Sequence, residues 1–149
     1  MNRDNLHRQY RTIQIIWAAM LSSLAIYAAV CHLAGDSLKQ GIGEGIPLDL
    51  IRNILIGVSV SELFAIQLIR KQILTLQKGM GQQNVIRKYL LASVISYAVC
   101  ESIGIFGLVL YFLGSTEEIL YSFIGMSALA MFYHRPVYED LEDLVKKGQ

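Results

Sequence analysis

The sequence has few charged residues, and it has no motif typical of an enzyme active site. Of its 149 residues, 17% are charged and 54% are hydrophobic. Soluble domains carry about 25% charged residues and spread their apolar residues more evenly. The composition therefore excludes an ordinary soluble domain and predicts a single membrane domain covering residues 1–149.

The chain also has only two cysteines and three histidines. Cys31 and Cys100 fall inside apolar segments, where they resemble small packing residues, so we expect no disulfide. His32 lies at the outer end of the first apolar segment, far from His7 and His134, so no metal or haem site is expected. A nucleophile motif, a phosphate-binding glycine loop and a cysteine cluster are all missing. We therefore predict no enzyme activity and no cofactor.

The apolar residues gather into segments that are each near the ~20 residues needed to cross a ~30 Å hydrocarbon core. This pattern predicts an all-α integral membrane protein with transmembrane helices arranged in two hairpins. The first segment exceeds the ~7–15 apolar residues of a signal peptide, so we expect it to be retained. The four segments are residues 12–34, 48–69, 89–113 and 119–133.

The positions of lysine and arginine predict the orientation, because basic loops stay on the cytoplasmic side. Basic residues precede the first segment, lie between the second and the third, and follow the fourth. The intervening loops, 35–47 and 114–118, are mainly acidic and should face outward. We expect both termini in the cytoplasm and a bacterial inner membrane as the location. Since the bases are dispersed, nucleic-acid binding is not expected. The basic residues at these three places are Arg3, Arg8, Arg11, Arg70, Lys71, Lys78, Arg87, Lys88, Arg135, Lys146 and Lys147, and the charges of the intervening loops are Asp36, Lys39, Glu44, Glu117 and Glu118.

Two pairs of segments resemble each other within the chain. SSLAIYAAV from Ser22 resembles ESIGIFGLV from Glu101 across nine successive positions, and residues 56–59 resemble residues 124–127. The order of the matches predicts a duplicated hairpin related by an axis along the membrane normal. Chance similarity between apolar helices is the alternative.

The loops and the tail have their own patterns. Glycine-rich sequence at Gly79-Met80-Gly81 predicts a break between the second and third segments. After Pro136, Leu141, Leu144 and Val145 share one face of a short amphipathic helix. This tail either lies along the inner surface, docks on a partner, or is a frayed solvated end.

Glu101 is the most informative residue of the chain. It lies near the middle of the apolar segment 89–113, and nothing close to it in sequence neutralises it. An ionisable group at the centre of a membrane span indicates function. Burial favours the protonated carboxyl group, so Glu101 is a candidate proton carrier. The alternative is a neutral glutamic acid bonded to a serine or a backbone carbonyl.

Small residues follow the same helix on the adjoining face. Ser96, Cys100, Gly104 and Gly107 recur at intervals of three and four residues. Such a stripe lets a second helix approach closely. We therefore predict a helix-packing surface at these residues, beside the face that carries Tyr97 and Glu101.

A second acid, Glu62, lies in the segment 48–69. If the second and third helices fold about Gly79, Glu101 lies level with Ser59, and Glu62 lies level with Ala98, one turn away. Glu101, Glu62, Ser59 and Tyr97 are therefore the candidate ion-binding residues. Further hydroxyl groups could satisfy either acid, unless these serines bond only to their own helix. They belong to Ser61, Ser93 and Ser96.

The segment VIRKYLLASVISYAVCESIGIFGLVLYFL resembles the carboxylate-bearing helix of the rotary ATPase proteolipid family, subunit c. In that family a membrane-embedded glutamate is followed at the fourth to seventh positions by Ile-Tyr-Gly-Leu. Here Glu101 is followed by Ile105-Phe106-Gly107-Leu108. The resemblance implies that Glu101 carries an ion and that the small stripe is a contact between subunits of a ring.

The resemblance covers residues 85–113 and does not extend further. Only Gly57 remains of the family's glycine-rich preceding helix, the loop has Gly79–Gln83 in place of Arg-Gln-Pro, and an extra helix stands on each side. Two hypotheses follow. The chain is either a membrane subunit that carries a proton or cation on Glu101, or a structural or assembly subunit without transport. In both cases the expected partners are the lipid bilayer and copies of the chain or a larger membrane complex.

Overall fold

A computed structural model describes residues 3–38, 45, 47–75 and 81–148. The described residues form five helices and no strand, which confirms the all-α prediction. Lys39, Gly41, Gly43, Glu44, Lys78, Gly79 and Met80, on which the loop predictions partly depend, lie outside the described residues. The helices are α1 (Arg3–Leu38), α2 (Leu48–Ile73), α3 (Gln82–Phe112), α4 (Glu117–Tyr133) and α5 (Tyr138–Gly148).

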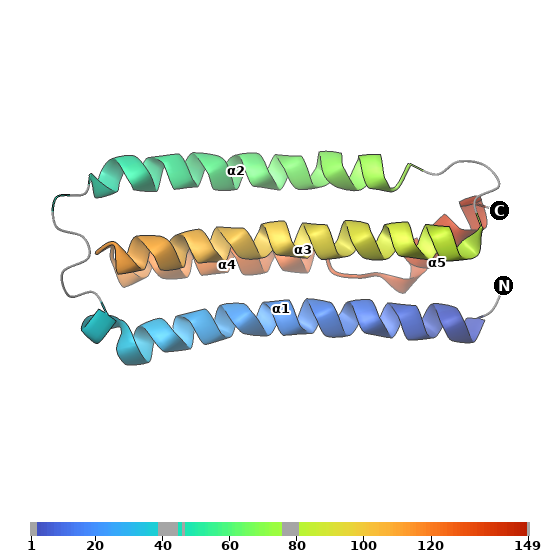
Figure 1. Cartoon of the computed structure of the whole chain (residues 1–149), viewed down its shortest axis with the longest axis horizontal. Helices are drawn as coiled ribbons and strands as arrows, with labels where there is room; N and C mark the ends of the chain where they lie inside the picture. Colours follow the sequence, from blue (N-terminus) through green and yellow to red (C-terminus); the bar gives the residue numbers. More distant parts are fainter. Residues whose placement is uncertain (1–2, 39–44, 46, 76–80, 149) are drawn as a thin grey trace.

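Helix α3 is the centre of the molecule. It contacts α1, α2, α4 and α5, and Figure 1 shows α1 and α2 on opposite sides of the α3–α4 pair. Its buried residues, which include Tyr89, Ser96, Ile103 and Leu110, fall on several faces. A helix that is apolar all round is expected to be enclosed by others, and this composition places α3 at the core.

The predicted pairing into two hairpins holds only for the second half of the chain. Helices α3 and α4 pack closely through the short turn 113–116, where Gly114 adopts a positive φ of 103°. In the described residues, α1 and α2 make little direct contact, because each packs on α3 instead. Helix α2 lies on the far side of α3 from α1 (Figure 1).

The direction of the helices is plain in Figure 1. Helices α1 and α3 run the same way, and α2 and α4 run the opposite way. The start of α1 and the whole of α5 therefore lie at the same end of the bundle, which we call the terminal end. A parallel duplication requires this arrangement, but the duplication itself stays a prediction.

The C-terminal tail is a helix docked on its own chain. Leu141 and Val145 of α5 are fully buried in one cluster with Leu6 of α1 and Val85 of α3. The amphipathic face predicted from the sequence thus finds its apolar surface within the bundle. The alternative of a frayed, solvated end is wrong, because burial of these side chains stabilises the helix.

Two helices of the described residues are long and apolar enough to cross a membrane. They are Leu6–Leu33 within α1, with a mean hydropathy of 1.9, and Gln82–Phe112, which is α3, with 1.8. Only 11% of the most apolar window of α1 is buried against the protein. The rest of this window is partly or fully exposed, which is unusual for a core helix of a soluble protein.

Candidate functional site

The carboxyl group of Glu101 faces α1. Tyr27 OH donates a hydrogen bond of 2.9 Å to Glu101 Oε1, and Ser23 Oγ donates to the same oxygen. All three side chains are partly buried. Ser23 and Tyr27 are four residues apart, so they project from the same face of α1. Two hydroxyl groups from one helix therefore hold the acid of another.

Sequence reasoning did not select Ser23 or Tyr27 as partners of Glu101. A signal was present in the internal repeat, which aligns Ser22 with Glu101. In a parallel repeat, equivalent positions lie at the same depth, and Ser23 is the next residue along. The match therefore pointed to the right level of α1 without giving the rotation of the helix.

The other two candidate ligands have different surroundings. Ser59 Oγ is buried and donates to the Leu55 carbonyl oxygen of its own helix at 2.8 Å. Tyr97 is also buried, and its hydroxyl makes no hydrogen bond within the described part of the chain. The structure brings neither residue into a hydrogen bond with Glu101 or Glu62 among the described contacts.

Glu62 accepts a hydrogen bond on Oε2 from Ser102 Oγ of α3, at 3.0 Å. Glu62 thus lies level with Ser102, about one turn beyond the predicted Ala98. The prediction that the two acids differ in depth by one turn is wrong, since Ser102 directly follows Glu101. Figure 1 shows the reason: α3 extends past the end of α2, so the two helices are not symmetric about the connection.

Three consecutive residues of α3 bond to three different helices. The Cys100 carbonyl accepts from Ser127 Oγ of α4, Glu101 accepts from α1, and Ser102 donates to Glu62 of α2. Successive side chains of a helix point about 100° apart, so Glu101 and Ser102 reach separate neighbours. Cys100 is contacted through its backbone carbonyl. We call this set the polar layer, and it consists of Ser23, Tyr27, Glu62, Cys100, Glu101, Ser102 and Ser127.

The serine beside each acid also contacts a backbone carbonyl. Ser23 Oγ lies 2.6 Å from the Met20 oxygen, and Ser102 Oγ lies 2.7 Å from the Val99 oxygen. A hydroxyl group has one proton to donate, so it cannot donate to both acceptors at once. When the acid is ionised, the serine donates to it. When the acid is protonated, it can donate to the serine, which donates to the carbonyl.

No described cation neutralises either acid. The ion pairs of the described residues join Arg52 to Asp49 and Lys146 to acids of its own helix, all on the surface. Within the same described ranges, no three His, Cys, Asp or Glu side chains gather in a way that could hold a metal ion. The acids of the polar layer therefore depend on hydroxyl donors.

The small residues of α3 lie against its neighbours. A Cβ placed on Gly107 would be 2.6 Å from Phe123 Cβ, and one on Gly104 would be 2.6 Å from Leu24 Cδ2. Ser96 and Cys100 are buried on adjoining turns, and Ser96 bonds to its own helix. The small residues let α4 approach α3 closely. Ser127 of α4 can therefore donate a hydrogen bond to the Cys100 carbonyl oxygen.

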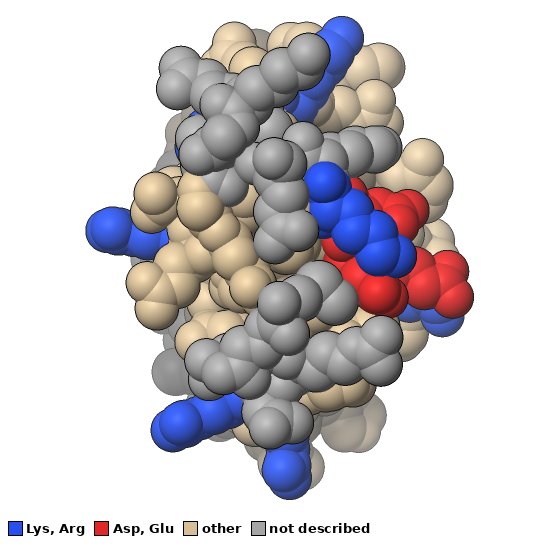
Figure 2. Space-filling model, turned by 90° about the vertical axis from the view of Figure 1, so that its right-hand side faces the viewer, with Lys and Arg blue, Asp and Glu red and all other residues tan. Residues whose placement is uncertain are grey.

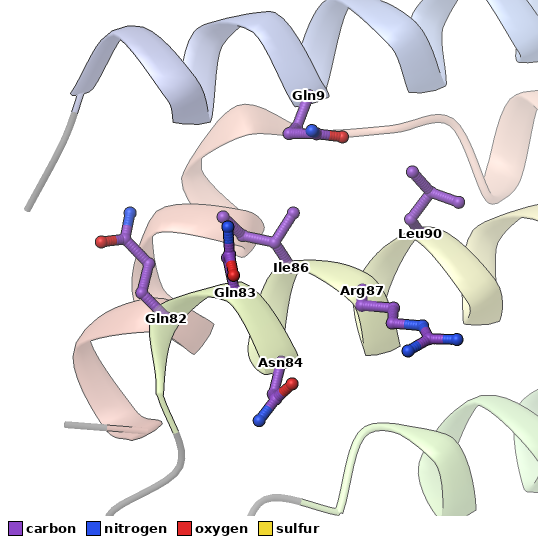
Figure 3. Close-up of a pocket in the computed structure, with 7 residues that line it drawn as sticks. All are labelled: Gln9, Gln82, Gln83, Asn84, Ile86, Arg87 and Leu90. Carbon is purple, nitrogen blue, oxygen red and sulfur yellow. The ribbon is translucent and has the colours of Figure 1, made fainter.

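A separate cavity of about 490 Å³ opens at the terminal end, between α1 and the first turns of α3. In Figure 3, Gln82 and Gln83 lie on the side of Gln9, whereas Asn84 and Arg87 point away from it. Its lining contains no residue of the polar layer. This cavity is therefore distinct from the candidate site.

His134 directly follows α4, and its environment predicts a pH effect. Burial lowers the pKa of this imidazole, and the positive charge of Arg70 lowers it further. The unfolded chain binds the proton near the ordinary pKa of about 6.5, while the folded protein resists it. Stability should therefore fall as the pH drops below that value. We expect a lower apparent Tm at pH ~5.5 than at pH ~7.5 in detergent.

The control is a matched pair of variants. His134→Gln should reduce this loss of Tm, whereas His32→Gln, at an exposed position of α1, should leave it unchanged. Equal acid sensitivity of wild type and His134→Gln would contradict the assignment.

The polar layer is the only place among the described residues where acids from two helices receive hydroxyl donors from other helices.

Comparison of the chain with protein-family models, with curated proteins and with solved structures gives no match.

Proposed function

We propose that the chain is an integral membrane protein in which α1 to α4 cross the bilayer and Glu101 carries a proton at mid-membrane. The length and apolarity of α1 and α3 support the proposal that the helices cross the bilayer. Helix α2 adds support, because it exposes large apolar side chains that lipid would cover. The most exposed are Phe64, Leu68, Leu50 and Ile54, at 69%, 64%, 59% and 55%.

The charge distribution supports the orientation. Figure 2 shows Lys and Arg side chains around the rim of the terminal end, with acidic side chains gathered to one side. Under the rule that basic segments stay inside, this end faces the cytoplasm of a bacterial inner membrane. Both termini then lie on that side.

The hydrogen bonding of Glu101 carries the proposal of proton binding. An arginine or lysine partner would fix the carboxylate in its charged form. Hydroxyl groups can both donate and accept, and Ser23 has the Met20 carbonyl as a second acceptor. Glu101 Oε1 can thus keep its hydrogen bonds to both hydroxyl groups in either protonation state without movement of the backbone. Reversible protonation is the chemistry that this arrangement supports best.

The proteolipid-like sequence around Glu101 supports the same function. In this proposal the chain acts as a membrane subunit beside further copies or within a larger complex. The exposed apolar face of α2 leaves room for lipid or for a neighbouring subunit.

Labelling with dicyclohexylcarbodiimide tests the proposal, because this reagent modifies protonated carboxyl groups in apolar surroundings. Mass spectrometry of the purified protein in lipid should find the label on Glu101. The Glu101→Gln variant should lose it completely, and Glu118→Gln, changed at an exposed site at the start of α4, should label like the wild type. An unreactive Glu101 in folded protein would count against proton binding.

A structural or assembly subunit is the second candidate. The observation that favours it is the polar layer itself, since its hydrogen bonds fix the relative depth of all the long helices. If Glu101 is only a structural anchor, Glu101→Gln should preserve assembly, and Glu101 should not react with the carbodiimide.

A further inference from the structure

Polar side chains follow one another along α3 at intervals of four residues, from the terminal end to Glu101. They are Tyr89, Ser93, Tyr97 and Glu101, and the first three are 1%, 1% and 0% exposed. Each step rises about 6 Å and rotates by about 40° around the helix. The row therefore winds from the side of α5 toward the side of α1. The next positions in this spacing, Ile105 and Val109, are apolar, so the row ends at Glu101.

The middle of this row has no hydrogen bond to any neighbouring element of the described chain. Ser93 Oγ and Tyr97 OH are buried, and neither makes a hydrogen bond within the described part of the chain. Buried polar atoms in folded proteins nearly always have a partner, either protein or water. Side chains four residues apart on a helix are neighbours, so Ser93 and Tyr97 lie close enough to interact with each other. A water molecule beside them would complete the hydrogen bonds of both hydroxyl groups. The two hydroxyls thus indicate internal water between Tyr89 and Glu101.

The side chains packed around the row are mainly apolar. Tyr89 and Tyr97 belong to one cluster with Leu6, Ile13 and Val85. Apolar walls offer water no competing hydrogen bonds, so the hydroxyl groups of the row become its only partners there. Ser96 differs from the row, because it already donates to the Ala92 carbonyl oxygen at 2.7 Å.

The row meets a polar cavity at its outermost member. Tyr89 lines a cavity of about 240 Å³ at the terminal end, together with Arg70, Asp140 and Asp143. Both aspartates are exposed and can exchange protons with bulk water. Tyr89 OH itself bonds to the Val137 backbone, where its oxygen is 3.3 Å from the carbonyl oxygen. The cavity thus connects the row to solvent at the terminal end of the bundle.

We propose that Tyr89, Ser93 and Tyr97, with water molecules between them, form a proton path from this cavity to Glu101. The inference rests on the proposed function, since it assigns the side from which Glu101 gains and loses its proton. In each transfer an O–H bond breaks as a hydroxyl passes its proton onward, and a new O–H bond forms with the proton that follows. Every hydroxyl is restored, and the net change is one proton gained or lost by Glu101.

Infrared spectroscopy of the full chain in lipid vesicles tests the path. The carbonyl stretch of protonated Glu101, identified by its loss in Glu101→Gln, shifts when deuterium replaces the proton after transfer into D2O. We expect Ser93→Ala and Tyr97→Phe each to slow this exchange roughly tenfold, the factor that corresponds to one net hydrogen bond. Ser93→Thr, which keeps the hydroxyl, should exchange at the wild-type rate.

Ser96→Ala is the matched control, because it removes a buried serine hydroxyl of α3 outside the row. It should leave the exchange rate unchanged. If Ser93→Ala and Tyr97→Phe exchange as fast as wild type while the Glu101 band persists, the path is wrong and proton binding by Glu101 stands. If wild type shows no band that depends on Glu101, the proposed function fails together with the path.

Discussion

Alanine at Gly107 is expected to destabilise the protein, whereas alanine at Gly125 is expected to leave it equally or more stable. A Cβ on Gly107 would lie 2.6 Å from Phe123 Cβ and 3.2 Å from the Leu120 carbonyl oxygen. Both atoms are fixed close to the backbone of α4, so the helices must separate. Overpacking of this kind costs about 1–3 kcal/mol. A Cβ on Gly125 meets no atom within 4 Å, and alanine favours a helix by about 0.5–1 kcal/mol over glycine.

Thermal unfolding in detergent measures the difference, because both variants make the same chemical change. Gly104→Ala should fall between them, since the atom it meets, Leu24 Cδ2, is the end of a side chain that can rotate. Equal stability of Gly107→Ala and Gly125→Ala would show that the close approach of α3 and α4 is not required.

Lysine in place of Tyr27 is expected to abolish carbodiimide labelling of Glu101 although the acid is still present. Tyr27 OH lies 2.9 Å from Glu101 Oε1, so an ammonium group on the same position of α1 can reach the carboxylate. An opposite charge within ~4 Å in a medium of low dielectric strongly favours the ionised form. Because the reagent requires the protonated acid, labelling should fall by more than roughly tenfold.

Two controls separate this effect from damage to the fold. Tyr27→Phe removes the hydroxyl without adding charge and should keep the label. Tyr27→Gln places a neutral polar side chain at the same position, and it should also keep the label. Wild-type labelling in folded Tyr27→Lys protein would contradict the placement of α1 beside Glu101.

The identity of the central acid could be predicted, but its partners could not. Glu101 stands out because it is the one acid of a long apolar segment. Its partners depend on which face of α1 turns toward α3. Since α3 is apolar on nearly every side, its sequence has no single apolar face to indicate the rotation. Ser23 and Tyr27 therefore looked like other residues of an apolar helix.

The depth of Glu62 shows the same limit. A symmetric hairpin places Glu62 level with Ala98, whereas Glu62 bonds to Ser102. Relative depth is set by packing of side chains and by the length of α3 beyond the end of α2, and neither is a local property of the chain. The tail is a parallel case: Leu141 and Val145 define an amphipathic face, but their partner Leu6 lies at the other end of the sequence.

The sequence by itself determined the helices, the central position of Glu101 in its apolar segment, and the small residues that permit close packing. These follow from bonds between residues four apart and from composition, which are local. Only the tertiary structure decided that Cys100, Glu101 and Ser102 each bond to a different helix. The reason is that the rotation and depth of one helix against another depend on side chains far apart in the chain, whose packing no local pattern specifies.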